Sequence, residues 1–254
     1  MSKNKFPPKN KHFRPSNKTD NKPVFLYGLH TVFAALSNQS RKKIRLSATA
    51  NALIRLKQMG DLPRIEILET SPKALDKLLG SEAVHQGLAL EVDPIDRPSI
   101  DSAFGASLLL VLDQVSDPHN VGAILRSACA FGADAVITTA RYAPGETGVL
   151  AKSASGALDY VPFIEVTNLS KTLEQLKKDG MTIIGFDSEA PTPLTPKLKF
   201  DKVALVLGAE GKGLRQKTRE TCDQMVKLDM SGPIKSLNVS NAAAIALYAL
   251  TTDK

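Results

Sequence analysis

The feature that most constrains the fold is a series of short, uninterrupted apolar runs that begins at residue 108. They are candidate strands at residues 108–112, 135–138, 181–186, 203–207 and 225–228. Successive side chains of a strand point to opposite faces, so a strand that is apolar throughout needs cover on both faces. Helical segments lie between the runs. The pattern therefore predicts an α/β fold whose sheet has helices on both sides.

Two of the helical segments add constraints. Residues 120–132 place apolar side chains on a single helical face, at Val121, Ile124, Leu125, Ala128 and Cys129. We therefore interpret Cys129 as a core residue rather than a nucleophile. The last helix, about residues 239–250, has no charged residue. We expect it to be buried on several sides, partly against a second subunit.

A different pattern precedes residue 94. The alternating runs at 43–46, 64–67 and 88–92 predict half-buried strands, and spaced apolar residues predict helices at 30–37, 51–59 and 72–79. Residues 24–93 are therefore predicted to form a small α/β domain. Residues 94–107 contain prolines, a glycine and several polar residues, which is typical of an interdomain linker before the 108–254 domain.

The N-terminal 23 residues carry most of the positive charge. They contain seven Lys or Arg residues against a single Asp, which accounts for +6 of the net charge of +7. Four prolines and little apolar material predict a disordered basic arm. Such arms commonly bind nucleic-acid phosphates, although a solubilising tail has the same composition.

Several classes of protein are disfavoured. The two cysteines form no CxxC pair, and the four histidines have no metal-ligand spacing, so we expect no metal site and no disulfide framework. No uncharged apolar stretch is long enough to span a bilayer, and the N-terminus has no signal-peptide core. We therefore expect a cytoplasmic protein with no membrane partner.

The first motif with chemical content is DQVSDPHNVGAILR at residues 113–126. Asp117 and Pro118 suit the N-cap and first turn of a helix, which is a purely structural role. Gly122 and Arg126 share a helix face, so we interpret the missing side chain of Gly122 as space beside the guanidinium. An arginine in a cleft suggests phosphate recognition.

The second motif is LVLGAEGKGL at residues 205–214, where an apolar strand leads into a loop with three glycines. Glycines let the backbone approach a ligand closely. The GxxGxG spacing matches neither the dinucleotide fingerprint nor the P-loop, which disfavours a nicotinamide-binding protein. Glu210, inside the loop, suits binding of a hydroxyl, an amine or an arginine, or is a solvated turn residue.

The third motif is LDMSGPIKSLNVS at residues 228–240, directly before the last helix. Ser236, Asn238 and Ser240 are candidates to cap that helix, and taken alone the motif favours capping. The chain has no GxSxG elbow and no histidine close in sequence to a candidate serine nucleophile, so hydrolysis by a catalytic triad is disfavoured.

In this order and spacing, DPHNxGxxxRSA, LVLGAEGxGL and MxGxxxSLNVS resemble the SpoU (TrmH) branch of the SPOUT RNA methyltransferases over residues 108–254. Upstream, YGLHTVFAAL near Tyr27 and HQGLALEV near His85 look like the L30e-like substrate-binding domain of 23S rRNA guanosine 2′-O-methyltransferases. The resemblance implies a parallel α/β fold with a C-terminal trefoil knot. It also implies methylation of a guanosine 2′-hydroxyl in 23S rRNA, with S-adenosylmethionine as methyl donor.

The resemblance also implies the site, assembled across a homodimer. The implied catalytic residues are Asn120, Arg126, Glu210, Ser236 and Asn238. The implied cofactor-binding residues are Gly208, Leu228, Met230, Gly232 and Leu237. The chain departs from the family pattern at Asp229, where proline is usual, and at Asn241, where valine is common.

The reaction requires a ribose hydroxyl, a very weak acid, to be aligned and activated. Arg126 is the activator that the family suggests, but a guanidinium is normally protonated. We therefore favour a role for Arg126 in holding the adjacent phosphate and stabilising the developing alkoxide. Ser236 or Asn238 would then hydrogen-bond the hydroxyl.

Two other functions remain open from the sequence. A tRNA 2′-O-ribose methyltransferase is disfavoured by the upstream domain, which the tRNA enzymes of this branch generally lack. An RNA-binding protein without catalysis is disfavoured because the implied catalytic set is complete.

Overall fold

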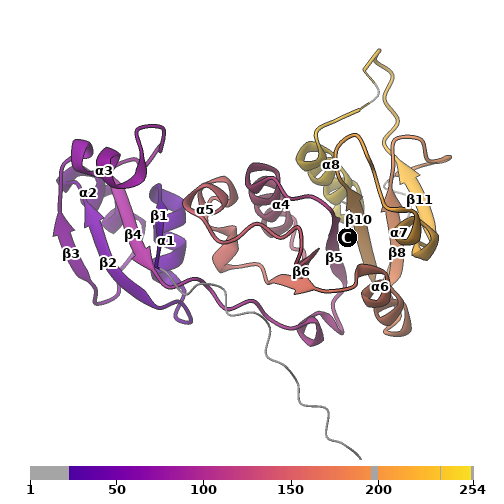
Figure 1. Ribbon diagram of the computed structural model, residues 1–254, viewed down its shortest axis with the longest axis horizontal. Helices are drawn as coiled ribbons and strands as arrows, with labels where there is room; N and C mark the ends of the chain where they lie inside the picture. The colour runs from indigo at the N-terminus through magenta and orange to yellow at the C-terminus, as the bar shows by residue number, and fades with distance from the viewer. Residues whose placement is uncertain (1–22, 196–199, 235, 253–254) are drawn as a thin grey trace, which may run out of the picture.

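The structure is a computed structural model that describes residues 23–195, 200–234 and 236–252. Two α/β lobes lie side by side, each built on its own sheet (Figure 1). We call residues 23–93 the N-terminal lobe and the described residues from 100 onward the C-terminal lobe; residues 94–99 join them. The predicted basic arm, apart from Pro23, lies outside the described residues.

The N-terminal lobe has a four-stranded sheet in the order β1-β4-β2-β3. Its strands are β1 (Val24–Tyr27), β2 (Lys43–Ala48), β3 (Glu66–Glu69) and β4 (Leu88–Val92). Its helices are α1 (Leu29–Ser37), α2 (Ala50–Met59) and α3 (Pro72–Leu79). The strand expected at 64–67 begins two residues later, and all four of its residues are exposed rather than half-buried. As the edge strand of the sheet, β3 has a partner on one side only.

The C-terminal lobe has a seven-stranded sheet in the order β7-β6-β5-β10-β8-β11-β9, and its neighbouring strands pair in parallel. Its strands are β5 (Leu108–Asp113), β6 (Ala135–Thr139), β7 (Phe163–Val166), β8 (Thr182–Phe186), β9 (Thr192–Pro193), β10 (Val203–Gly208) and β11 (Gln224–Lys227). The five strands expected from the apolar runs are confirmed. Strands β7 and β9 were not expected; β9 has only two residues, too few to give a pattern.

Helices cover both faces of this sheet, as the uninterrupted apolar strands predict. In β5, Leu108, Leu110 and Leu112 pack into the core beneath α4 and α8, whereas Leu109 and Val111 pack into the core beneath α6. The helices are η1 (Ile100–Ala103), α4 (Pro118–Ala130), α5 (Gly148–Ala154), η2 (Ala157–Asp159), α6 (Leu169–Lys178), α7 (Gln216–Thr221) and α8 (Val239–Thr251).

Helix α4 follows the sequence expectation closely. Asp117 caps it by accepting a hydrogen bond from the His119 backbone N–H, and Pro118 occupies its first turn. Its predicted apolar face is buried, and Cys129 packs against that core at the margin. This agrees with the interpretation of Cys129 as a core residue.

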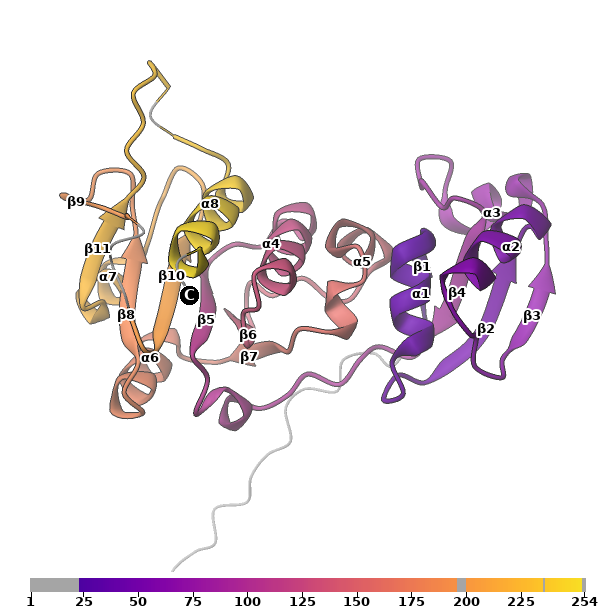
Figure 2. The same ribbon diagram turned by 180° about the vertical axis from the view of Figure 1, so that it is seen from behind.

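Helix α8 is only partly buried within its own chain. We expected burial on several sides, but within a single chain it is buried on one face, through residues such as Ala243 and Leu247. Ile245 and Tyr248, on the other side, are about half exposed, at 45% and 56%. The helix lies against α4 and β10 (Figure 2), and no residue that the structure describes in the same chain covers its outer face.

Candidate active site

The carboxyl ends of β8, β10 and β11 surround a pocket of about 330 Å³. In an open parallel sheet the loops that follow the strands form the usual ligand site. Here the pocket is lined by residues 186–189 after β8, residues 207–213 at the end of β10, and Leu228, Met230, Ser236 and Leu237 after β11. Val239 and Ala242 of α8 and Arg219 of α7 complete the lining. A pocket of this volume suits a small molecule.

A polar cluster lies beside this pocket and joins the three sequence motifs. The side-chain amide Nδ2 of Asn238 donates to Asn120 Oδ1 at 2.9 Å and to Glu210 Oε1 at 2.7 Å. The same Glu210 oxygen accepts from the Val239 backbone N–H at 3.2 Å. Residues far apart in the chain thus meet where α4, the β10 loop and α8 begin.

Asn238 uses all of its hydrogen-bonding capacity in these contacts. Its Oδ1 accepts from the Ser240 backbone N–H at 2.9 Å and from Ser240 Oγ at 2.6 Å, which caps α8. A backbone N–H can only donate, so it fixes which end of the amide is the oxygen. Both Nδ2 hydrogens then serve Asn120 and Glu210. The side chain of Asn238 therefore caps α8 and also links the three motifs, and its amide has no free N–H to donate to a substrate.

The glycine loop after β10 folds tightly on itself. The Gly213 backbone N–H donates to the Ala209 carbonyl at 2.9 Å, and Gly211 and Gly213 have positive φ. A Cβ atom on Gly208 would lie 2.2 Å from the Gly213 carbonyl carbon. Gly208 is therefore required for the loop to close on its own backbone, which sets the shape of the pocket wall.

Of the five residues expected to bind the cofactor, four line the pocket: Gly208, Leu228, Met230 and Leu237. Gly232 lies exposed in the same 229–238 segment, outside the lining. Of the five expected catalytic residues, Glu210 and Ser236 line the pocket, and Asn120 and Asn238 join Glu210 in the polar cluster.

Arg126 stands apart from this group. It is exposed on α4, and its side chain makes no hydrogen bond or ion pair with any other residue that the structure describes. The expectation that Gly122 leaves space beside its guanidinium is wrong. A Cβ on Gly122 would lie 2.5 Å from Ser153 Cβ and 2.8 Å from the Leu150 carbonyl oxygen. Gly122 instead lets α5 pack directly on α4.

The sequence model of the SpoU rRNA Methylase family matches residues 107–248, which contain the whole pocket and the polar cluster. A second model, for the RNA 2′-O ribose methyltransferase substrate-binding domain, matches residues 25–98. The chain belongs to the SpoU rRNA methylase family.

Comparisons with individual SpoU proteins extend over nearly the whole chain. The chain is 39% identical to 23S rRNA (guanosine-2′-O-)-methyltransferase RlmB of Ralstonia nicotianae, over 89% of this chain and 94% of the relative. It superposes on a TrmH-family protein from Porphyromonas gingivalis with a TM-score of 0.74 and 26% identity, covering 92% and 91% of the two chains. It also shares its fold with the SpoU methyltransferase AviRb from Streptomyces viridochromogenes, solved with the cofactor AdoMet. That match has a TM-score of 0.73 and 22% identity, and covers 89% and 88% of the chains.

Two features of this SpoU site were missed at the sequence level. Asp187, directly after β8, lines the pocket and forms an ion pair with Arg219 of α7. Asp113, the last residue of β5, is fully buried and accepts from the Arg215 backbone N–H at 3.0 Å and from its Nε at 2.7 Å. Both acids follow or end an apolar run, so the rule that loops at strand carboxyl ends form the site could have identified Asp187.

Two further observations apply to the described part of this SpoU chain. Residues 23–195, 200–234 and 236–252 contain no group of three or more His, Cys, Asp or Glu side chains that could hold a metal ion. Within the same ranges, no helix has the length and apolar character needed to cross a membrane.

Proposed function

We propose that this protein uses S-adenosylmethionine to methylate the ribose 2′-hydroxyl of a guanosine in 23S rRNA. The observation that carries the proposal is the Asn120–Glu210–Asn238 cluster beside a closed glycine-loop pocket. It occurs in a chain similar along almost its whole length to an RlmB protein whose name states this activity. Ribosomal RNA is a cytoplasmic substrate, so the proposed place of action is the cytoplasm.

The pocket fits the chemistry of S-adenosylmethionine. Leu207, Leu228 and Leu237 provide apolar surface for an adenine ring. The carboxylates of Asp187, Glu189 and Glu210 suit ribose hydroxyls and positively charged groups. When bound, S-adenosylmethionine would supply the methyl group from its positively charged sulfur: the methyl carbon would bond to the 2′-oxygen, the neutral thioether would leave, and the hydroxyl proton would pass to water. Gly208, Leu228, Met230, Gly232 and Leu237 are the proposed cofactor residues.

The proposed roles of the catalytic residues follow from their contacts. Asn238 is saturated, so the role of contacting the 2′-hydroxyl falls to Ser236, which is exposed and lines the pocket. Asn120 and Glu210 hold Asn238, and with it the start of α8, in place. Arg126 holds the phosphate beside the reacting ribose and stabilises negative charge on its oxygen.

A homodimer explains two features of the single chain. The outer face of α8, with Ile245 and Tyr248, is apolar and uncovered. Arg126 has no partner among the described residues of its own chain. In a symmetric dimer, each protomer covers the exposed α8 face of the other. Arg126 of one protomer then lies at the pocket of its partner, where it contacts the RNA phosphate.

The finer features of the fold are also part of the proposal. We assign an L30e-like fold to residues 24–93, a linker to 94–107 and a SpoU methyltransferase domain with a trefoil knot to 108–254. The knot is supported by the course of the chain, because Met230 and Ser236 line the same pocket as the β10 loop, and α8 then returns to pack on α4 and β10. Residues 1–23 are proposed to bind RNA phosphates through their positive charge.

The test is transfer of a labelled methyl group to RNA. Purified protein is incubated with isotopically labelled S-adenosylmethionine and either unmodified 23S rRNA or unmodified tRNA transcripts, and 2′-O-methylated positions are mapped. We expect one guanosine of 23S rRNA to be labelled. Labelling of tRNA alone would favour the tRNA enzyme, and cofactor-independent RNA binding without labelling would favour a non-catalytic RNA-binding protein.

A further inference from the structure

The two lobes share a single hydrophobic core. Leu26, Val32 and Ala35 of the N-terminal lobe belong to the same buried cluster as Leu150 and Ala154 of α5. Strand β1 and helix α1 pack against α5 and η2, and both views show them side by side (Figures 1 and 2). Relative motion of domains is the usual expectation unless their interface is large and hydrophobic. We call the interface of β1 and α1 with α5 and η2 the seam, and its buried side chains named above are all apolar.

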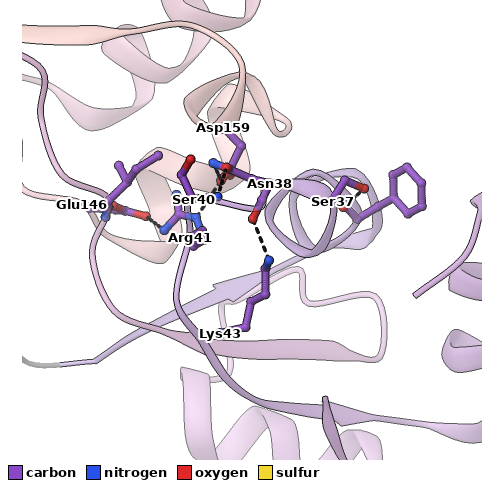
Figure 3. A network of polar contacts seen from close by, with 9 residues as sticks. Ser37, Asn38, Ser40, Arg41, Lys43, Glu146 and Asp159 are labelled. Carbon is purple, nitrogen blue, oxygen red and sulfur yellow. Dashed lines mark hydrogen bonds and ion pairs between the residues drawn. The ribbon is translucent and has the colours of Figure 1, made fainter. Parts of the chain in front are cut away.

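A buried ion network closes the seam at one end (Figure 3). Arg41, in the turn between α1 and β2, donates from Nη1 to Glu146 Oε1 and from Nε to Asp159 Oδ1, both at 2.6 Å. The side chains of all three residues are at most 4% exposed. Asn38 donates to the same Asp159 oxygen at 3.0 Å. One guanidinium of the N-terminal lobe is thus held by two carboxylates of the C-terminal lobe.

Glu146 also fastens the connecting segment. Its second oxygen, Oε2, accepts from the Ile95 backbone N–H at 2.8 Å. Two residues later, Arg97 lies over the Phe163 ring at 4.3 Å and pairs with Glu165 at 3.2 Å. The segment between the lobes is therefore fixed along the surface of the C-terminal lobe. It is a linker held in place by these contacts.

The geometry of this network fixes orientation as well as contact. A guanidinium is a planar fork, and here two of its nitrogens meet acids on either side of α5, Glu146 in the loop before it and Asp159 at the end of η2 after it. Burial disfavours the charged form of Arg41, but its hydrogen bonds and charge pairing with Asp159 and Glu146 outweigh this and raise its pKa. A rotation of either lobe would leave buried charges unpaired, which is costly.

The network connects to the proposed active site through packed helices. Glu146 and Asp159 flank α5, and α5 packs directly on α4 because Gly122 has no side chain. Helix α4 carries Asn120, which is braced by Asn238. The N-terminal lobe is therefore linked to the end of α4 that carries Asn120 through a series of packed helices.

We propose that Arg41 is a positioning residue for RNA methylation: by locking the N-terminal lobe onto α5, it sets the distance between bound RNA and the methyl-transfer site. This rests on the proposed function. The proposal predicts that the N-terminal lobe keeps a fixed orientation relative to the C-terminal lobe while it binds RNA. RNA held by this lobe reaches the pocket with one particular nucleotide in place.

The test separates positioning from folding and from binding. In Arg41→Ala, the turnover number on 23S rRNA should fall by about tenfold to a hundredfold, the scale on which small misplacements of a substrate act. The affinity for RNA should change by less than about threefold, because Arg41 is buried and cannot contact RNA. The affinity for S-adenosylmethionine should change by equally little, because the pocket lies at the far edge of the C-terminal lobe. Arg41→Lys keeps the charge without the fork and should restore part of the turnover.

Arg45→Ala is the matched control. Like Arg41→Ala, this substitution removes one arginine from the N-terminal lobe. The ion-pair partner of Arg45 is Glu91, at 3.0 Å, which belongs to the same lobe. Its turnover number should match wild type. If Arg41→Ala does not fold, Glu146→Gln, which has nearly the same shape, takes its place. A turnover number within about twofold of wild type, or a loss matched by an equal loss of cofactor affinity, would overturn the proposal.

A second measurement does not depend on methylation. Small-angle X-ray scattering should show a larger maximum dimension for Arg41→Ala than for wild type and Arg45→Ala, because Glu146 and Asp159 separate from the seam to become hydrated. Unchanged scattering would overturn the role of Arg41 in locking the lobes together. If the wild-type protein methylates no RNA, the proposed function fails, while the scattering comparison still decides whether Arg41 locks the lobes.

Discussion

The side-chain amide of Asn238 donates to the carboxylate of Glu210 across 2.7 Å, while its oxygen caps α8. Asp is as good an N-cap as Asn, so Asn238→Asp keeps the cap but places a second carboxylate against Glu210. We expect cofactor affinity to fall by about tenfold or more near pH 8, because two carboxylates in contact repel each other.

In Asn238→Asp, a proton taken up by the introduced carboxyl group as the pH falls removes this repulsion. Cofactor affinity should therefore recover toward acidic pH, the direction opposite to a loss caused by unfolding in acid. Titration calorimetry across pH measures this. Asn168→Asp, the same change at the N-cap of α6, is the control and should have no such pH dependence. Equal effects in both variants would refute the role of the Asn238–Glu210 contact.

Arg126→Ala should lower methyl transfer by about a hundredfold or more, because it removes charge stabilisation from the transition state. Cofactor affinity should stay nearly constant, since Arg126 does not line the pocket. Arg126→Lys should rescue activity only in part, because an ammonium lacks the planar fork. Single-turnover kinetics with saturating RNA and cofactor would measure the effect, and near-normal rates in Arg126→Ala would remove this residue from the mechanism.

Ser236→Ala tests the assignment that follows from the saturation of Asn238. If Ser236 contacts the 2′-hydroxyl, the turnover number should fall by about tenfold to a hundredfold, with little change in the affinity for RNA. Rates of methyl transfer and filter binding of the same RNA provide the two quantities. A change in RNA affinity alone would place Ser236 outside the chemical step.

Gly208→Ala should abolish cofactor binding, because its Cβ would lie 2.2 Å from the backbone of Gly213 and the loop cannot close. The expected loss of stability is about 1–3 kcal/mol, as for other overpacked sites. Gly145→Ala is the control, since its Cβ would meet no atom within 4 Å. Calorimetric binding of S-adenosylmethionine and thermal unfolding would be measured for both variants, and normal binding by Gly208→Ala would contradict the role given to the loop.

Cys222 should resist alkylation in the folded protein. Burial raises the pKa of its thiol to about 11, and its Sγ donates to the Thr218 carbonyl. Only the thiolate reacts, so the folded-state rate should rise about tenfold per pH unit up to that pKa. Mass spectrometry of the Cys222 peptide after timed iodoacetamide labelling gives the rate. Rapid labelling at neutral pH would mean that the thiol is not held in this environment.

The sequence by itself determined most of the strands and several of the helices, with the faces that they bury. In β5, residues 108–112 are all apolar, and Leu109 and Leu110 lie in opposite cores, as a sheet covered on both sides requires. The helical spacing from Val121 to Ala128 marked the buried face of α4. These are local periodicities, and burial of apolar surface enforces them wherever the strand or helix lies.

The three-dimensional structure decided what local patterns cannot encode, namely which distant residues meet. Capping and catalysis were competing interpretations of Asn238, and the structure shows one amide making the cap with its oxygen and the contacts to Asn120 and Glu210 with its nitrogen. Gly122 proved to be a contact point for α5, because close approach of two backbones depends on the partner and not on the glycine's own sequence. The Arg41–Glu146–Asp159 lock has no motif at all, since more than 100 residues separate the arginine from either acid and only the folded chain brings them together.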